Sequence, residues 1–113
     1  MTEEQETETR SSKAYATRGQ NRGEEIALDV RFQSGDAWAF PYAYLMALRL
    51  NADGEILAFF STHRMTIRGR NLRPLYELLQ QRQVAWIQEG SERHDFEEES
   101  ETAIHGIEIE ELK

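Results

Sequence analysis

Residues 51–79 read NADGEILAFFSTHRMTIRGRNLRPLYELL, and this stretch sets the fold class. Its first four residues predict a hairpin turn, because Asn and Asp side chains bond the turn backbone and Gly tolerates a positive φ. Residues 56–60 are apolar on both faces, which is typical of a central, covered strand, and Met65 and Ile67 alternate with polar residues over 63–70, which is typical of a further strand. The apolar residues of 72–79 recur instead at i, i+3, i+4 and i+7. This segment is therefore predicted to form an amphipathic helix, with Asn71 as its N-cap.

Strands are predicted on both sides of this stretch. Residues 26–33 alternate apolar and polar, residues 37–50 are largely apolar and aromatic, and shorter apolar patterns cover 84–89 and 103–109. Pro41 lacks a backbone donor and does not fit mid-ladder in a central strand, so a bend is expected there. The sequence predicts an α+β fold: a two-layer, mainly antiparallel sheet of about five to six strands in the order β-β-β-β-α-β-β, with one amphipathic helix on one face.

Charge is distributed unevenly along the 113 residues, whose net charge is −8. The net charge is +1 over residues 26–90 and −7 over residues 91–113. Residues 1–24 contain one aromatic residue and no Val, Ile, Leu or Phe, so we expect a disordered polar and acidic arm. The rest, residues 25–112, is expected to form one small domain that contains an acidic, solvated loop at 91–102.

The composition also bears on location. The chain has no cysteine, which excludes disulfides and thiolate metal sites. The longest uncharged run, residues 37–48, is shorter than the ~20 apolar residues that span a bilayer. Residues 1–10 lack the apolar stretch of a signal peptide. We therefore expect a cytoplasmic protein that does not bind membranes.

Catalysis and cofactor binding have no supporting motif. His63, His94 and His105 lack metal-ligand spacing, and the acids at 95 and 97–99 are more typical of a solvated loop than of a metal cage. The sequence contains no GxSxG, GxGxxG or GxxxxGK[ST] pattern. We expect a non-enzymatic protein with no catalytic, cofactor-binding or metal-binding residues and no cofactor.

A run of arginines provides the first candidate site. Arg64, Arg68 and Arg70 project to one side of an extended segment, and Arg73 follows in the first turn of the helix. Such a stripe beside a helix N-terminus suits phosphate or carboxylate groups, so it is a candidate anion- or partner-binding site. Two plainer interpretations stay open: the arginines are solvated residues of a strand, or the acids of the loop or C-terminus neutralise them.

The aromatic segment provides the second candidate site. Trp38, Phe40, Tyr42 and Tyr44 share one parity, so they would crowd one face of a strand, while alanines leave the other face nearly bare. Phe40 and Tyr44 are predicted to lie in the core. Trp38 and Tyr42 flank the proline bend and are predicted to be partly exposed, as interface residues. The small-residue face and an unpaired strand edge would then let two copies join.

These observations lead to one functional expectation and one alternative. The expectation is a non-enzymatic interaction or regulatory domain that binds a protein partner or a second copy of itself. The alternative is a nucleic-acid- or anion-binding module that uses the arginine stripe, although the sequence has neither an RRM nor a KH signature. Nucleic acid is therefore the weaker of the two partner expectations.

Overall fold

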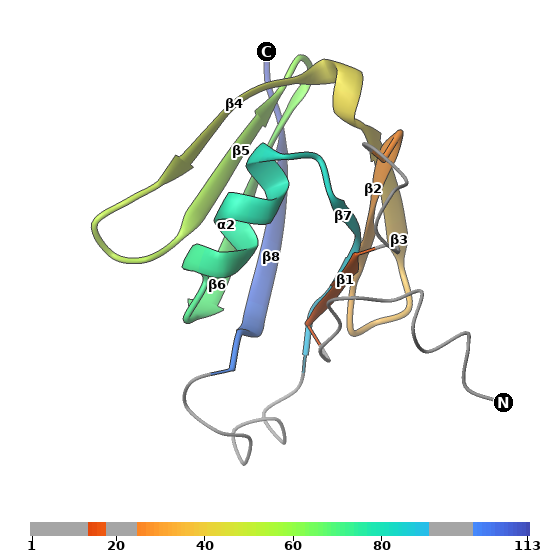
Figure 1. Cartoon of the computed structure of the whole chain (residues 1–113). Coiled ribbons are helices and arrows are strands. Elements are labelled where there is room, and N and C mark those ends of the chain that lie inside the picture. The colour runs from red at the N-terminus through yellow and green to blue at the C-terminus, as the bar shows by residue number, and fades with distance from the viewer. Residues whose placement is uncertain (1–13, 18–24, 91–100) are drawn as a thin grey trace, which may run out of the picture.

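The computed structural model describes residues 14–17, 25–90 and 101–113, which form eight strands, one α-helix and a short 3-10 helix (Figure 1). In chain order the elements are β1 (Tyr15–Thr17), β2 (Ala27–Arg31), β3 (Ala37–Pro41), η1 (Tyr42–Tyr44), β4 (Leu45–Leu50), β5 (Ile56–Phe60), β6 (His63–Arg70), α2 (Arg73–Gln80), β7 (Val84–Gln88) and β8 (Ala103–Glu111).

The strands make two sheets of four. The first sheet has the order β1-β7-β2-β3, and the second sheet has the order β4-β5-β6-β8. Every strand pair is antiparallel except β2 with β7, which is parallel. The α+β class is confirmed in this coarse sense. The prediction of one sheet with about five to six strands is wrong, because the chain forms eight strands in two sheets.

The division into two sheets arises where the chain leaves β3. Pro41 ends that strand with φ −63° and ψ 133°, and the next three residues turn as η1 before β4 begins. The bend predicted at Pro41 is thus present. It has a larger consequence than predicted, because the segment 37–50 is divided between the two sheets rather than kept within one.

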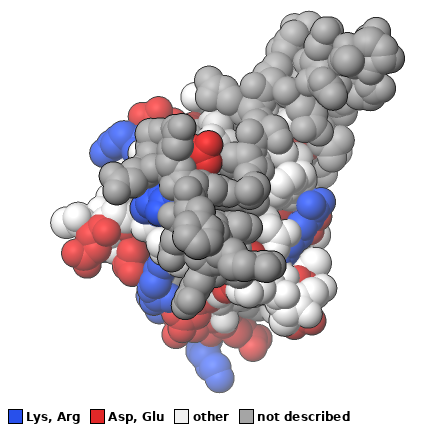
Figure 2. Space-filling view, turned by 90° about the horizontal axis from the view of Figure 1, so that it is seen from below, with Lys and Arg blue, Asp and Glu red and all other residues white. Residues whose placement is uncertain are grey.

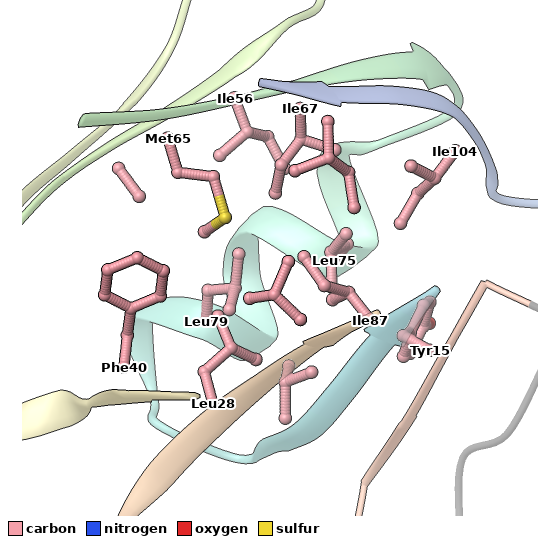
Figure 3. Close-up of a cluster of buried hydrophobic side chains, with 14 of the residues drawn as sticks. Tyr15, Leu28, Phe40, Ile56, Met65, Ile67, Leu75, Leu79, Ile87 and Ile104 are labelled. Carbon is pink, nitrogen blue, oxygen red and sulfur yellow. The ribbon is translucent and has the colours of Figure 1, made fainter. Parts of the chain in front are cut away.

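Helix α2 lies between the two sheets rather than on the outer face of one (Figure 1). Leu75 and Leu79 are almost fully buried and point into the space between the sheets, where Leu28 of the first sheet and Ile67 of the second approach them (Figure 3). Each such side chain contributes about 1.5–3 kcal/mol by leaving water. The helix therefore supplies the central part of the core that joins the sheets.

The start of α2 differs from the prediction. The N-cap residue is Leu72, with no side-chain cap hydrogen bond, whereas Asn71 adopts a left-handed conformation with φ 53°. Asn tolerates this conformation, so it serves as the corner between β6 and the helix rather than as the cap. The Thr102 hydroxyl donates to the Asn71 carbonyl at 2.7 Å.

No helix within residues 14–17, 25–90 and 101–113 has both the length and the apolar character to cross a bilayer.

Part of the predicted disordered arm is a strand. Residues 15–17 form β1, which pairs with β7 and is buried along its whole length. A short strand needs few apolar residues, because backbone hydrogen bonds such as Gln88 N–H to the Ala14 carbonyl, at 2.7 Å, hold it in place. Residues 1–13 and 18–24 of the arm, and 91–100 of the acidic loop, lie outside the described residues.

Candidate functional site

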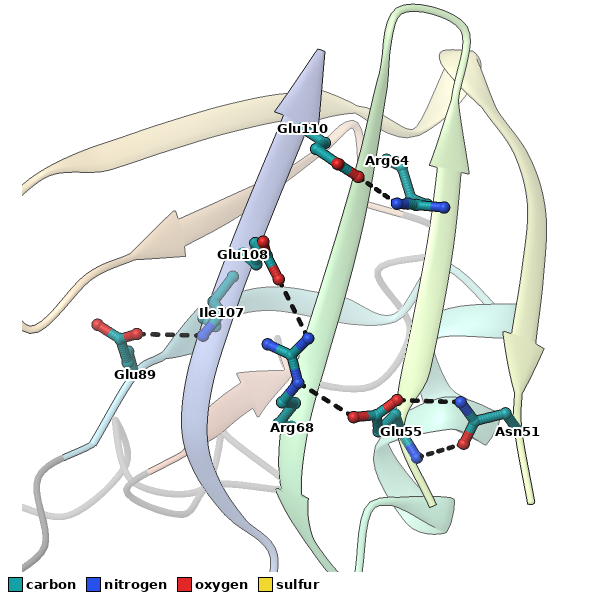
Figure 4. Close-up of polar contacts among 8 residues, drawn as sticks. All are labelled: Asn51, Glu55, Arg64, Arg68, Glu89, Ile107, Glu108 and Glu110. Carbon is teal, nitrogen blue, oxygen red and sulfur yellow. Dashed lines mark hydrogen bonds and ion pairs between the residues drawn. The ribbon is translucent and has the colours of Figure 1, made fainter. Parts of the chain in front are cut away.

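Two arginines of the predicted stripe are paired with acids of the same chain (Figure 4). Arg64 of β6 forms an ion pair with Glu110 of β8. Arg68 Nη2 lies 3.1 Å from Glu108 Oε1, and its Nε lies 3.0 Å from Glu55 Oε2. Hydrogen bonds to Glu108 and then to Glu55 raise the pKa of Arg68. Arg64 and Arg68 thus pair with acids of their own chain, two of which belong to the C-terminal strand.

The β6–β8 register produces this pairing. Arg64 lies directly opposite Glu110, and Thr66 lies directly opposite Glu108. The two arginines of β6 and the two acids of β8 therefore project from the same face of the sheet, with Glu108 diagonal to Arg68. The hairpin turn adds Glu55. Its carboxylate accepts from Asn51 Nδ2 at 3.0 Å, and this bond, followed by those from Arg68, lowers the pKa of Glu55.

The other two arginines of the stripe lie elsewhere. Arg70 ends β6 and Arg73 begins α2, and both line an open hollow of about 460 Å³ with Gly69 and Asn71 between them. The structure thus brings Arg70 and Arg73 together at one end of the helix, while Arg64 and Arg68 lie farther along the strand. Where described residues are visible in Figure 2, basic and acidic side chains adjoin one another.

The aromatic segment is only partly as predicted. Phe40 is buried and Trp38 is 41 % exposed, as expected. Tyr42 is buried at 2 % exposure and Tyr44 is 56 % exposed, so both of those predictions are wrong. Tyr42 keeps the inward parity of Phe40 although it follows the proline bend, whereas the 3-10 turn η1 breaks the alternation before Tyr44.

Tyr42 has a structural role. Its hydroxyl donates to the Val84 carbonyl at 2.8 Å, inside the core, and thereby ties the crossing segment to β7. Burial raises the pKa of this phenol well above its ordinary value. Tyr42 is therefore not accessible as an interface residue.

Trp38 lies at the rim of the core. Its ring stacks on Phe40 with centroids 5.4 Å apart and meets His63 edge-on at 5.2 Å. These contacts hold the indole in place beside β3 while a large part of its surface stays in water. A large aromatic side chain that is already ordered is a suitable anchor for a protein partner.

The outer edge of β3 carries unused backbone groups. Phe32 N–H bonds the Asp36 carbonyl and Tyr42 N–H bonds the Ile26 carbonyl, so residues 38 and 40 are the ones that exchange hydrogen bonds with β2. The intervening residues Ala37 and Ala39 direct their N–H and C=O groups to the other side. No strand of the described chain pairs with that side of β3.

The three other sheet edges are blocked. Strand β8 has the acids that pair with β6, and its Ile107 N–H donates to Glu89 Oε2 at 3.1 Å (Figure 4). Strand β1 is only three residues long. Strand β4 contains an irregularity near Met46 and the charged Arg49. Short strands, charges, bulges and prolines are the usual means of protecting a sheet edge, and of these β3 has only Pro41, at its end.

Glu89 is a residue that the sequence did not single out. Its carboxylate accepts from Gln33 N–H at 2.9 Å, next to β2, and from Ile107 N–H of β8, so one side chain joins the two sheets. An acid at the end of an apolar strand carries no sequence signal for such a role, because both partners are backbone groups distant in the chain.

Among the residues that the structure describes, no group of three or more His, Asp or Glu side chains converges as a metal site would require. The segment with His94 and its neighbouring acids lies outside the described residues. Comparison of the chain with protein-family models, with curated proteins and with solved structures found no match.

Proposed function

We propose that this chain is a non-enzymatic interaction module that binds a polypeptide strand of a protein partner along the outer edge of β3. The observation that carries the proposal is the combination on one edge of outward backbone groups at Ala37 and Ala39 with the exposed, ordered indole of Trp38. In strand addition of this kind, main-chain hydrogen bonds provide affinity and a side-chain anchor provides specificity.

The arginine stripe supports the alternative, binding of nucleic acid or another anion, less well. Arg64 and Arg68 already bond three acids of the chain, so an anion would have to displace those carboxylates. A protein partner also suits the aromatic anchor better, because Trp is enriched at the centres of protein interfaces. A cytoplasmic location, expected from the sequence, is part of the same proposal.

A peptide-selection experiment tests the proposed edge. Random ten-residue peptides displayed on phage are panned on the full chain, and the enriched peptides are then titrated against two variants. Ala39→Pro removes an outward N–H that the β2–β3 ladder does not use, and proline is tolerated at such edge positions. Ala52→Pro is the matched control, because Ala52 is an exposed alanine in the hairpin turn where proline is favoured.

We expect the selected peptides to lose roughly fivefold in affinity or more on Ala39→Pro and to keep their affinity on Ala52→Pro, since a main-chain hydrogen bond contributes about 1 kcal/mol and its loss leaves a peptide carbonyl without a donor. Amide NMR shifts should concentrate at residues 37–40. Peptides that bind both variants equally would contradict the proposal. Salt-sensitive shifts at residues 63–75 with a mixed-sequence oligonucleotide would instead support the alternative.

A further inference from the structure

We infer that the strand which binds the β3 edge is β3 of a second copy, in an antiparallel register centred on Trp38. This inference rests on the proposed function and names its partner. It follows from the hydrogen-bonding phase of β3, from the order of residues around Trp38 and from the charges on the neighbouring strand.

The phase makes the edge self-complementary. Ala37 and Ala39 present outward N–H and C=O groups, and they lie symmetrically on either side of Trp38. When two such edges meet in antiparallel orientation, Ala37 of each copy lies opposite Ala39 of the other. The two pairs exchange four hydrogen bonds about a two-fold axis, which is the self-matching interface that a symmetric dimer requires.

The side chains fit this register. The two Trp38 residues would meet at the axis as a non-hydrogen-bonded pair, the arrangement in which opposing side chains are closest. On the opposite face of the strand the methyl groups of Ala37 and Ala39 and the ring of Pro41 project, and all three residues are exposed. The joined first sheets would form one continuous sheet of twice four strands.

The charges on β2 suit the antiparallel orientation. Arg31 lies opposite Ala37 and Asp29 lies opposite Ala39 in the β2–β3 register. In the antiparallel dimer each row across the interface therefore runs from Arg31 of one copy, over two alanines, to Asp29 of the other. Arg31 and Asp29 also pair with each other at 3.0 Å within each copy, so joining the edges leaves neither charge without its partner.

Sedimentation equilibrium of the full chain, up to about 1 mM, tests the partner, because a small strand-edge interface is expected to bind weakly. We expect the average mass to rise from 13.2 kDa toward twice that value. Ala39→Pro should weaken dimerisation at least tenfold, Ala52→Pro should leave it unchanged, and Trp38→Ala should weaken it as well. Trp38 also packs on Phe40, so Trp38→Ala can destabilise the fold. In that case the comparison of Ala39→Pro with Ala52→Pro decides the outcome.

Cysteine cross-linking tests the register, since the chain has no cysteine of its own. Residues directly opposite in a hydrogen-bonded antiparallel pair have Cα atoms about 5.5 Å apart, within disulfide range. We expect oxidation to link Ala37→Cys to Ala39→Cys in a 1:1 mixture, with ¹⁵N labelling of one variant to identify the mixed product. Each variant alone should cross-link poorly.

The possible results separate the two proposals. A chain that stays monomeric at 1 mM but binds selected peptides at β3 overturns the second-copy inference and leaves the proposed function standing. Efficient self-linking of each single cysteine variant overturns the antiparallel register. A monomeric chain whose selected peptides ignore Ala39→Pro overturns both.

Discussion

Strands β3 and β8 occupy equivalent places, each at one edge of a four-stranded sheet, yet their surfaces differ. Strand β8 carries acids that pair with arginines of β6, and an outward N–H of its edge, at Ile107, donates to Glu89. Strand β3 contains no charged residue and leaves the backbone groups of two alanines directed outward. The comparison teaches that two conspicuous arginines of this chain pair with its own acids, whereas the inconspicuous AWA sequence leaves backbone groups that no strand of the described chain pairs with.

The largest expected effect comes from breaking the β6–β8 pairing. A Cβ added at Gly69 would lie 1.9 Å from the Ala103 carbonyl oxygen, and neither backbone can give way without separating the strands. We expect Gly69→Ala to reduce the free energy of unfolding by about 3 kcal/mol, as measured by urea denaturation.

Gly106 provides the matched control across the same pair of strands. It lies opposite Arg68, and a Cβ there would meet nothing within 4 Å. Gly106→Ala should therefore be neutral or stabilise by up to about 1 kcal/mol, because alanine loses less backbone entropy than glycine. Equal destabilisation by both substitutions would mean that the close approach at Gly69 does not limit the pairing.

The next effect concerns the segment through which β3 connects to the second sheet. Tyr42→Phe removes the donor to the buried Val84 carbonyl, and we expect a loss of about 1–3 kcal/mol in the free energy of unfolding. Tyr44→Phe alters an exposed side chain two residues later and should change stability by less than about 0.5 kcal/mol. Thermal unfolding of the two variants compares them, and a similar small loss in both would remove the anchoring role of Tyr42.

This pair of tyrosines also shows where sequence patterns stop being informative. Period two correctly places Val30, Met65 and Ile67 inside, and the period of the helix correctly buries Leu75 and Leu79. Both patterns are local. The parity of Tyr44 with Phe40 fails because a single 3-10 turn, which no sequence pattern indicates, rotates the chain between two strands.

The candidate sites show the same limit: local patterns could be predicted, and contacts between distant segments could not. The common face of Arg64 and Arg68 could be predicted from spacing alone, and so could the partial exposure of Trp38. The acids that pair with Arg64 and Arg68 could not be assigned from the sequence. Glu55 follows the hairpin turn, and Glu108 and Glu110 lie on a strand about 40 residues away, which the β6–β8 register brings alongside. The open edge of β3 likewise depends on which strands share a sheet, and that partition is a property of the whole fold rather than of any one segment.

A charge variant tests whether the acids of β8 neutralise the stripe. The double substitution Glu108→Gln and Glu110→Gln removes the acid that pairs with Arg64 and one of the two acids that pair with Arg68, which keeps Glu55. We expect binding of a single-stranded mixed-sequence oligonucleotide to strengthen, with a log–log salt slope steeper by roughly 0.7, since one phosphate contact, at Arg64, becomes available. Fluorescence anisotropy at several salt concentrations measures this slope.

The control has the same change in net charge at a different place. Asp36→Asn with Asp53→Asn also removes two exposed acids, but from turns at the ends of β3 and β4. Its effect on the salt slope should be small. If both double variants bind the oligonucleotide alike, the change reflects net charge, and the pairing along β6 and β8 has no special part in it.

The smallest effect is a dependence of stability on pH at Glu55. The Asn51 amide and then Arg68 hold the pKa of this carboxylate below its ordinary value of 4.5, so the folded state favours the charged form. The resulting stabilisation is present above about pH 4.5 and is lost as the pH falls through the lowered pKa of the folded state.

Glu55→Gln should therefore reduce the free energy of unfolding near neutral pH, and the gap from the parent should close at lower pH, as urea denaturation between pH 7 and pH 3 measures. The glutamine oxygen can still accept from Asn51, so the variant removes the charge and leaves the turn intact. In a chain that already carries Arg68→Gln, the further substitution Glu55→Gln should change the free energy of unfolding less, because Arg68 contributes to the lowered pKa of Glu55. A gap that stays constant over the whole range would mean that the ion pairs of this face contribute nothing to stability, and that the acids beside β6 only keep the arginines from binding anions.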